Sequence, residues 1–207
     1  MKKNLFIALE GIDGSGKSTQ QKLLKEKFEQ AGHKVYTTCE PTDNPIGKMI
    51  REIFSHKMEA DHNTIAALFV ADRLDHIQNK TNGILKMLQD GYTVITDRYY
   101  FSSYAYQSAH VDLDWVIQAN TLSAALLRPD LNVYIDITAE QSIERITKGR
   151  EKIELYETLE NLKNVHNKYF EVMGMLKGEE EIFVTDGNRL PEVISGDIWA
   201  ELVKRIG

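Results

Sequence analysis

The segment that most constrains the fold is GIDGSGKST at residues 11–19, which directly follows the apolar run LFIAL. Residues 11–18 match the pattern G-x-x-x-x-G-K-[ST] without a mismatch. The glycines allow the backbone to curl so that successive N–H groups point at one anion, and a following helix adds its dipole. Because the segment stands between an apolar run and a helical pattern, it predicts a loop that binds the phosphates of a nucleoside triphosphate.

The rest of the chain alternates between short apolar runs and longer segments with helical spacing. Strands are expected at residues 5–11, 34–40, 92–98, 131–137 and 181–187. Helices are expected after the glycine loop, ending at Gly32, over 63–91, from an N-cap at Thr138, and over about 190–205. This alternation predicts an α/β fold with a mainly parallel sheet.

Length and composition narrow the class of protein further. The 207 residues fit one domain, 1–207, and the net charge of −6 argues against broad nucleic-acid binding. A single cysteine, Cys39, excludes an internal disulfide framework and a multi-cysteine metal site. Since no apolar run has the length of a membrane span and the N-terminus lacks a signal-peptide pattern, a cytoplasmic protein without a membrane partner is expected.

The glycine loop carries two residues suited to phosphate chemistry. Lys17 can reach the β- and γ-phosphates, and the Ser18 hydroxyl can bind Mg²⁺. A regulatory GTPase is disfavoured because Asn79-Lys80 and Asn167-Lys168 both lack an aspartate two residues further on, as the N-K-x-D motif requires. A chain of this size with scattered arginines and a charged insert suits a kinase that acts on a small phosphorylated acceptor.

Four further groups of residues agree with a kinase, and each has a plainer alternative. Asp97 and Arg98, at the end of the third expected strand, suit Mg²⁺ and a phosphate, or form a surface pair. Phe69 and Arg73 share a helix face and suit a nucleobase, although spacing alone favours a core Phe and a solvent-facing Arg. Polar residues at 102–107 suit a base or sugar, or begin a helix. An arginine in GREK (149–152) suits a closing insert, or a solvated loop.

In combination, these motifs resemble one family. The segments GIDGSGKST, CEPTDNPIGKMIR, LFVADR, TDRYYFSSYAYQ and the charged insert occur in the order and at the spacing of thymidylate kinases, from about residue 5 to residue 170. The most specific part is DRY followed by S-x-x-A-Y-Q. The resemblance implies a P-loop NTPase-type five-stranded parallel sheet surrounded by helices, with a short LID insert at about 148–160. It also implies a homodimer that phosphorylates dTMP to dTDP with Mg·ATP, in dTTP synthesis.

The resemblance also implies roles for the matching residues. For ATP the residues are Gly11, Asp13, Gly14, Ser15, Gly16, Lys17, Ser18 and Thr19, with Mg²⁺ on Ser18 and Asp97. For dTMP, Asp13 would bind the 3′-hydroxyl, Arg51 and Arg98 the phosphate, and Phe69 and Arg73 the thymine; Ser103, Tyr106 and Gln107 would complete the base and sugar pocket, which Glu40 would border. Tyr106 would crowd a ribose 2′-hydroxyl. The catalytic residues would be Lys17, Asp97, Arg98 and Arg150.

The chain departs from the family pattern at two places. It reads CEPTDN at 39–44, where many bacterial relatives read R-E-P-G-G-T. It also has Gly14 and Ser15 where one subgroup carries a catalytic arginine, which moves that role to the insert. Arg150 is the candidate there, with Arg145 and Lys152 as alternatives.

Three functions remain open at this stage: a dTMP kinase with some activity on dUMP, a kinase for another nucleoside monophosphate, and a non-catalytic nucleotide-binding module. The apolar stretch 113–127 and the long 63–91 helix point to self-association, unless both simply pack on the sheet.

Overall fold

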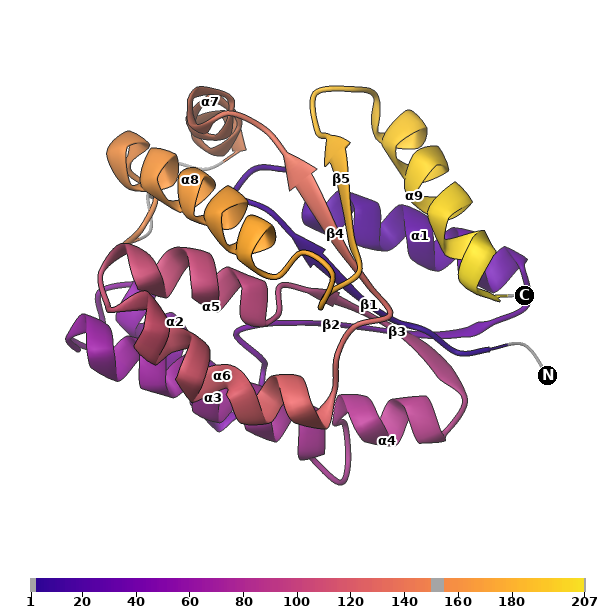
Figure 1. The fold of residues 1–207 in the computed structure, drawn as a ribbon, viewed down its shortest axis with the longest axis horizontal. Helices are drawn as coiled ribbons and strands as arrows, with labels where there is room; N and C mark the ends of the chain where they lie inside the picture. The colour runs from indigo at the N-terminus through magenta and orange to yellow at the C-terminus, as the bar shows by residue number, and fades with distance from the viewer. Residues whose placement is uncertain (1–2, 150–154, 207) are drawn as a thin grey trace.

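The computed structural model describes residues 3–149 and 155–206. At its centre lies a parallel sheet of β1 (Phe6–Glu10), β2 (Lys34–Cys39), β3 (Tyr92–Asp97), β4 (Leu131–Asp136) and β5 (Ile182–Asp186), in the order β2-β3-β1-β4-β5 (Figure 1). Each strand lies within its expected range. The predicted α/β fold with a five-stranded parallel sheet is therefore confirmed.

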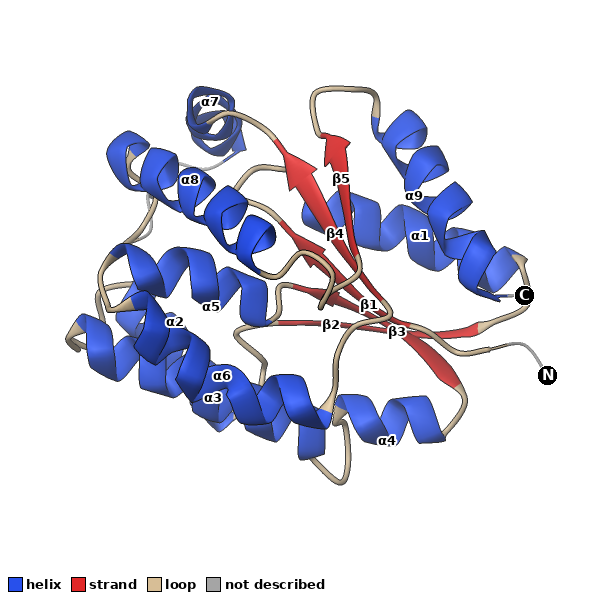
Figure 2. Cartoon of the chain, in the orientation of Figure 1, coloured by secondary structure: helices blue, strands red, loops and turns tan. Residues whose placement is uncertain are grey.

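Helices cover both faces of this sheet (Figure 2). They are α1 (Lys17–Gln30), α2 (Pro45–Phe54), α3 (His62–Gln78), α4 (Ile84–Gln89), α5 (Tyr100–Tyr106), the short 3₁₀ helix η1 (Gln107–Ala109), α6 (Leu113–Leu126), α7 (Ala139–Gly149), α8 (Leu159–Met175) and α9 (Pro191–Ile206). Helix α1 contacts α9, and α5 contacts α8, α6 and η1. Within the described ranges, none of the helices has both the length and the apolar character needed to cross a bilayer.

The central strand explains why the sheet has two cores. Every residue of β1 is buried, as expected for a parallel strand covered on both faces. Ile7 belongs to a core with Leu24 of α1 and Ile198 of α9. Its neighbour Phe6 belongs to the other core, which includes residues of α5 and α8. Because successive side chains of a strand point to opposite faces, one apolar run supplies both cores.

The expectation of one helix over 63–91 is wrong. Helix α3 ends at Gln78 and α4 begins at Ile84. Between them, Asn79 Oδ1 accepts a hydrogen bond from the N–H of Thr81 at 3.0 Å, so the side chain stabilises a turn instead of the next helical turn. Gly83 ends this turn. A Cβ at that position would lie 2.4 Å from the carbonyl oxygen of Asn79, so a larger residue would not fit there.

Other helix ends follow the sequence signals. Gly32 has a φ of 80° and follows the last turn of α1. At the start of α7, Thr138 Oγ1 accepts from the N–H of Gln141, and Gln141 Oε1 accepts from the N–H of Thr138. This reciprocal pair is a capping box, which fixes where α7 begins beyond β4.

Parallel strands bring all their carboxyl ends to one edge of the sheet, where ligands of such folds bind. The loops after β1, β2 and β3 meet there through the pairing of β1 with β3 and of β3 with β2. The candidate residues 11–19, 40–44 and 97–107 all follow these strands.

Candidate active site

The glycine loop joins β1 to α1, as predicted. Gly11 has a φ of 141°, and a Cβ there would lie 2.6 Å from the carbonyl oxygen of Ile135, so only glycine fits. Gly16 has a φ of 101° and is the N-cap of α1. Gly14, Ser18 and Thr19 are exposed, and Ser15 is buried. Among the described residues, the Ser15 hydroxyl has no hydrogen-bond partner, which fits a loop that contacts a ligand.

Lys17 lies inside the curve of this loop. Its Nζ donates to the carbonyl oxygens of Gly11 at 3.0 Å and Ile12 at 3.1 Å, and its side chain is almost fully buried. Burial lowers the pKa of the Lys17 amine, and the nearby charge of Arg98 lowers it further. The ammonium is thus held by two neutral carbonyl groups, which an anion can replace.

The proposed metal ligands lie next to each other. The Ser18 hydroxyl donates to Asp97 Oδ2 at 2.8 Å, because α1 begins beside the end of β3. Hydroxyl and carboxylate oxygens are ligands that Mg²⁺ accepts, together with phosphate oxygens and waters. In the described part of the chain, no cluster of three or more acidic, His or Cys side chains has metal-binding geometry. Ser18 and Asp97 together offer oxygen ligands of the kind that Mg²⁺ takes beside phosphate oxygens and waters.

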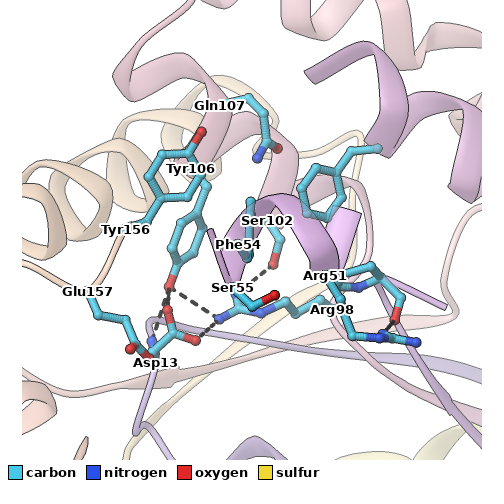
Figure 3. Close-up of a pocket in the computed structure, with 12 residues that line it drawn as sticks. Asp13, Arg51, Phe54, Ser55, Arg98, Ser102, Tyr106, Gln107, Tyr156 and Glu157 are labelled. Carbon is cyan, nitrogen blue, oxygen red and sulfur yellow. Dashed lines mark hydrogen bonds and ion pairs between the residues drawn. The ribbon is translucent and has the colours of Figure 1, made fainter. Parts of the chain in front are cut away.

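Arg98 reaches from the end of β3 to the glycine loop. Its Nη1 donates to the carbonyl oxygen of Gly11 at 3.2 Å and to Ser102 Oγ at 3.1 Å, and its Nη2 pairs with Asp13 (Figure 3). The backbone of Arg98 has a φ of 75°, which is unusual for a residue with a side chain. This turn of the backbone directs the guanidinium across the end of β1.

Asp13 and Tyr106 complete a cluster with Arg98. The Tyr106 hydroxyl donates to Asp13 Oδ2 at 2.8 Å and accepts from the N–H of Asp13 at 3.1 Å. The Arg98 guanidinium carbon lies 4.7 Å from the centre of the Tyr106 ring. Burial would raise the pKa of Asp13, but the charges of Arg98 and Lys17 hold it below its usual value. The carboxylate therefore stays ionised beside the loop.

A cavity of about 400 Å³ opens beside this cluster. Six of the predicted dTMP-binding residues line it: Asp13, Arg51, Phe69, Arg98, Tyr106 and Gln107. Its volume and its mixture of apolar and polar walls suit a small organic ligand. Among the described residues, the buried Gln107 Oε1 and Ser103 Oγ have no hydrogen-bond partner, although Ser103 does not itself line the cavity.

Six lining residues had no individual role in the sequence analysis, although Ser102 lies in the polar segment 102–107 and two others in the expected insert: Pro41, Phe54, Ser55, Ser102, Tyr156 and Glu157. Tyr156 lies within the expected insert, and its ring packs 5.3 Å from that of Phe54. The sequence did carry a signal for this contact. Tyr156 is an aromatic residue in a highly charged segment, and a fully solvated loop would have no use for it.

Two predicted base-pocket residues, Arg73 and Glu40, do not line the cavity. Arg73 is fully buried, and its Nη2 donates to Glu40 Oε2 at 2.6 Å and to the carbonyl oxygen of Tyr99 at 3.2 Å. Its Nη1 donates to Asn120 Oδ1, and Glu40 Oε1 lies 3.0 Å from His76 Nδ1. The reading of Arg73 as a solvent-facing residue is wrong, because a buried carboxylate attracts it inward. Its proposed contact with thymine stays a prediction.

Arg51 binds the segment in which the chain departs from the family pattern. Its guanidinium donates to the carbonyl oxygens of Pro41 and Thr42, and it pairs with the exposed carboxylate of Asp43 at 2.5 Å. Thr42 is also held by Asp72, which accepts from its N–H at 2.8 Å. The segment after β2 is therefore fixed by α2 and α3 without the glycines of the usual motif.

The candidates for a catalytic arginine in the insert are only partly described. Arg150 and Lys152 lie outside the described residues. Arg145, on α7, donates to the carbonyl oxygen of Gly14 at 3.2 Å and to that of Gly187 at 2.9 Å. It therefore joins the glycine loop to the segment after β5.

Comparisons with known proteins agree with this geometry. A family model described as thymidylate kinase matches residues 9–198. A probable thymidylate kinase of Pyrococcus horikoshii is 41% identical over 208 residues, which cover 98% of this chain and 97% of that protein. Proteins of the same description from Pyrobaculum aerophilum and Methanococcus aeolicus are 38% and 33% identical; the first match covers 97% of each chain, and the second covers 98% of this chain and 97% of the relative.

Proposed function

Since this chain belongs to the thymidylate kinase family, we propose that it forms dTDP by transferring the γ-phosphoryl group of ATP to dTMP in the cavity beside the glycine loop. The observation that carries this proposal is the position of Arg98. Its guanidinium contacts the carbonyl oxygen of Gly11 in the loop and also lines the cavity. A phosphate in the cavity and a phosphate on the loop would therefore meet at one fixed cation.

The positive charges of the site would allow the donor and acceptor phosphates, both anions, to approach each other. Lys17 and Arg98 both donate to the carbonyl oxygen of Gly11 and would offset the repulsion between donor and acceptor phosphates. The Arg98 side chain is held by Gly11, Ser102 and Asp13, so it is already positioned before the reaction. Phosphoryl transfer needs mainly positioning and charge stabilisation of this kind.

Ser18 and Asp97 would hold Mg²⁺, which would neutralise charge on the phosphate oxygens. Their 2.8 Å contact supports this assignment because both oxygens already lie at one point beside α1. The loop residues Gly11 to Thr19 would bind the phosphates through backbone N–H groups and the N-terminus of α1.

The walls of the cavity support the proposed contacts with dTMP. Phe69 would stack on thymine, and Gln107, with an unpartnered buried Oε1, would bind its polar edge. Tyr106 would crowd a ribose 2′-hydroxyl, and Asp13 beside it would accept from the 3′-hydroxyl. Arg51 would share the acceptor phosphate with Arg98. Because one methyl group in an apolar pocket is worth about 1–3 kcal/mol, some activity on dUMP is expected.

Arg150 stays our candidate for a cation that closes on the transferring phosphoryl group. Replacement by Ala should reduce turnover by orders of magnitude with little change in dTMP binding. Unchanged turnover would move the role to Lys152 or to Arg145, whose contact with Gly14 supports the second choice.

A homodimer formed through α6 is the proposed assembly. Trp115, Leu122 and Leu126 of this helix are 40%, 55% and 36% exposed. Apolar side chains grouped on one helix are typical of a surface that is covered by a partner. The predicted cytoplasmic location is supported by the use of ATP, and the absence of a nucleic-acid partner by the net charge of −6.

The proposed function is tested by measuring ADP release with Mg·ATP and each of dTMP, dUMP, dGMP, dAMP, dCMP and UMP. A strong preference for dTMP is expected, with dUMP second. Lys17→Met is the control that removes phosphate binding and should abolish every activity. Preference for a purine nucleotide would refute the assigned base pocket. ATP binding without any transfer would refute the proposed reaction.

A further inference from the structure

Glu10, the last residue of β1, carries a carboxylate that the proposed reaction does not use. Its side chain is 1% exposed. Oε1 accepts a hydrogen bond from the N–H of Tyr99 at 2.8 Å, and Oε2 accepts from the hydroxyl groups of Ser102 at 2.6 Å and Tyr169 at 3.0 Å. The carboxylate therefore connects the start of the glycine loop with the turn after β3 and with α8.

The backbone contacts of Glu10 surround Arg98. The N–H of Arg98 donates to the carbonyl oxygen of Leu9 at 2.9 Å, and the next N–H along the chain, that of Tyr99, donates to Glu10. Arg98 itself has a φ of 75°, a conformation that is sterically unfavourable for a residue with a Cβ. Such a conformation persists only where neighbouring contacts hold it, and Glu10 supplies one of those contacts.

Glu10 also controls the side chain of Arg98 through Ser102. The Ser102 hydroxyl lies 2.8 Å from the Tyr169 hydroxyl, and each of the two has one hydrogen, which it donates to Glu10 Oε2. The Ser102 oxygen is then left to accept from Arg98 Nη1 at 3.1 Å. An ionised carboxylate can only accept hydrogen bonds and so fixes this direction. An amide at the same place would be able to donate to Ser102 Oγ, in competition with Arg98.

We propose that ionised Glu10 is a positioning residue, which acts through Tyr99 and Ser102 to hold the Arg98 guanidinium where the acceptor phosphate binds. The inference rests on the proposed function, which assigns Arg98 to that phosphate. A purely structural role would not need the charge. Burial raises the pKa of Glu10 to about 6 despite the hydrogen bonds and Arg98, so a neutral amide would be less costly to bury.

The test is a double-mutant cycle of Glu10→Gln and Arg98→Ala, with the dissociation constants of dTMP and of ATP measured by calorimetry. Glu10→Gln should weaken dTMP binding by roughly tenfold or more when Arg98 is present, as expected for loss of a hydrogen bond to a charged group. It should weaken it by less than about twofold in the Arg98→Ala protein. ATP binding should change by less than about threefold in either case, since the glycine loop keeps its backbone.

Glu180→Gln is the matched control, because the Glu180 side chain is 3% exposed and its carboxylate accepts from a tyrosine hydroxyl, that of Tyr100 at 2.7 Å. It should leave dTMP binding unchanged. Ser102→Ala is the second variant, used if Glu10→Gln does not fold, and should give the same loss confined to dTMP. Equal losses in the two Arg98 backgrounds, or a similar loss in the control, would overturn the proposal.

A readout without substrate separates this inference from the proposed function. The guanidinium N–H signals of Arg98, assigned by their absence in Arg98→Ala, should be resolved in the NMR spectrum of the wild type and broadened in Glu10→Gln. Unchanged signals would overturn the positioning role even if the enzyme phosphorylates dTMP. If the wild type prefers another nucleoside monophosphate, the proposed function fails, and the same cycle with that nucleotide still tests Glu10.

Discussion

Removal of the Glu40 carboxylate should destabilise the folded protein, because it takes away the charged partner of a buried arginine. Arg73 is fully buried, and Glu40 is its only described partner with a negative charge, at 2.9 Å from Nε and 2.6 Å from Nη2. The change Glu40→Ala leaves the guanidinium in the interior with only the neutral oxygens of Asn120 and Tyr99. Loss of one partner of a buried ion pair costs about 3–5 kcal/mol.

This cost converts to a large thermal shift. For a chain of this size, one kcal/mol corresponds to roughly 2–4 °C in Tm, so Glu40→Ala should melt about 6–20 °C below the wild type. The assay is thermal unfolding followed by circular dichroism, with urea unfolding as a second measure. Asp43→Ala is the control, because the Asp43 carboxylate that pairs with Arg51 is 93% exposed, and its loss should lower Tm by less than about 4 °C.

A double variant separates the buried charge from simple loss of packing. Glu40→Leu combined with Arg73→Met removes both charges and keeps apolar volume, so it should recover at least half of the lost stability. A shift below about 4 °C for Glu40→Ala would refute the reasoning. A double variant no more stable than Glu40→Ala would show that packing, and not an unpaired charge, causes the loss.

Three further predictions follow from the site and its surroundings. Tyr106→Phe, which leaves the N–H of Asp13 without its hydroxyl acceptor, should lower kcat/KM for dTMP by about tenfold while leaving the KM for ATP within about twofold, as measured by steady-state ADP release. The raised pKa of Glu10, from 4.5 to about 6, means that the folded state holds this proton more tightly than the unfolded state, so stability from this group is present below pH 4.5 and is lost as pH rises through 6. Urea unfolding from pH 4.5 to 7 should show wild type losing about 2 kcal/mol relative to Glu10→Gln, and parallel curves would contradict this. Leu122→Lys, on the exposed face of α6, should convert a dimer to a monomer in light scattering, whereas a monomeric wild type would remove the proposed interface.

The sequence predicted the sheet well because its strands are short apolar runs separated by clear turn signals. Even β1, buried on both faces, was recognisable from its unbroken apolar residues and from the glycine loop that follows. The break between α3 and α4 was missed, because periodicity continues across it while one side chain, Asn79, hydrogen-bonds two backbone N–H groups of the turn. Local hydrogen bonding of this kind overrides an apolar pattern.

The site was predictable where the residues belong to a contiguous motif. Lys17 and Ser18 lie where the loop pattern requires them. The environment of Arg73 was not predictable from spacing, because Glu40 and Asn120 come from distant parts of the chain. Helical spacing says which residues share a face, but it does not say whether that face meets a buried carboxylate or water.

The backbone of Arg98 has a consequence for the choice of residue at position 98. Its left-handed conformation costs about 1–2 kcal/mol for most residues, whereas glycine and asparagine adopt it readily. Glycine at position 98 would remove this backbone cost, but it would also remove the ion pair with Asp13 and the hydrogen bond to Ser102, so the arginine is retained against its own backbone preference by contacts that belong to the site. In a library of variants at position 98, neither glycine nor asparagine should therefore melt above the wild type, although both suit the backbone better.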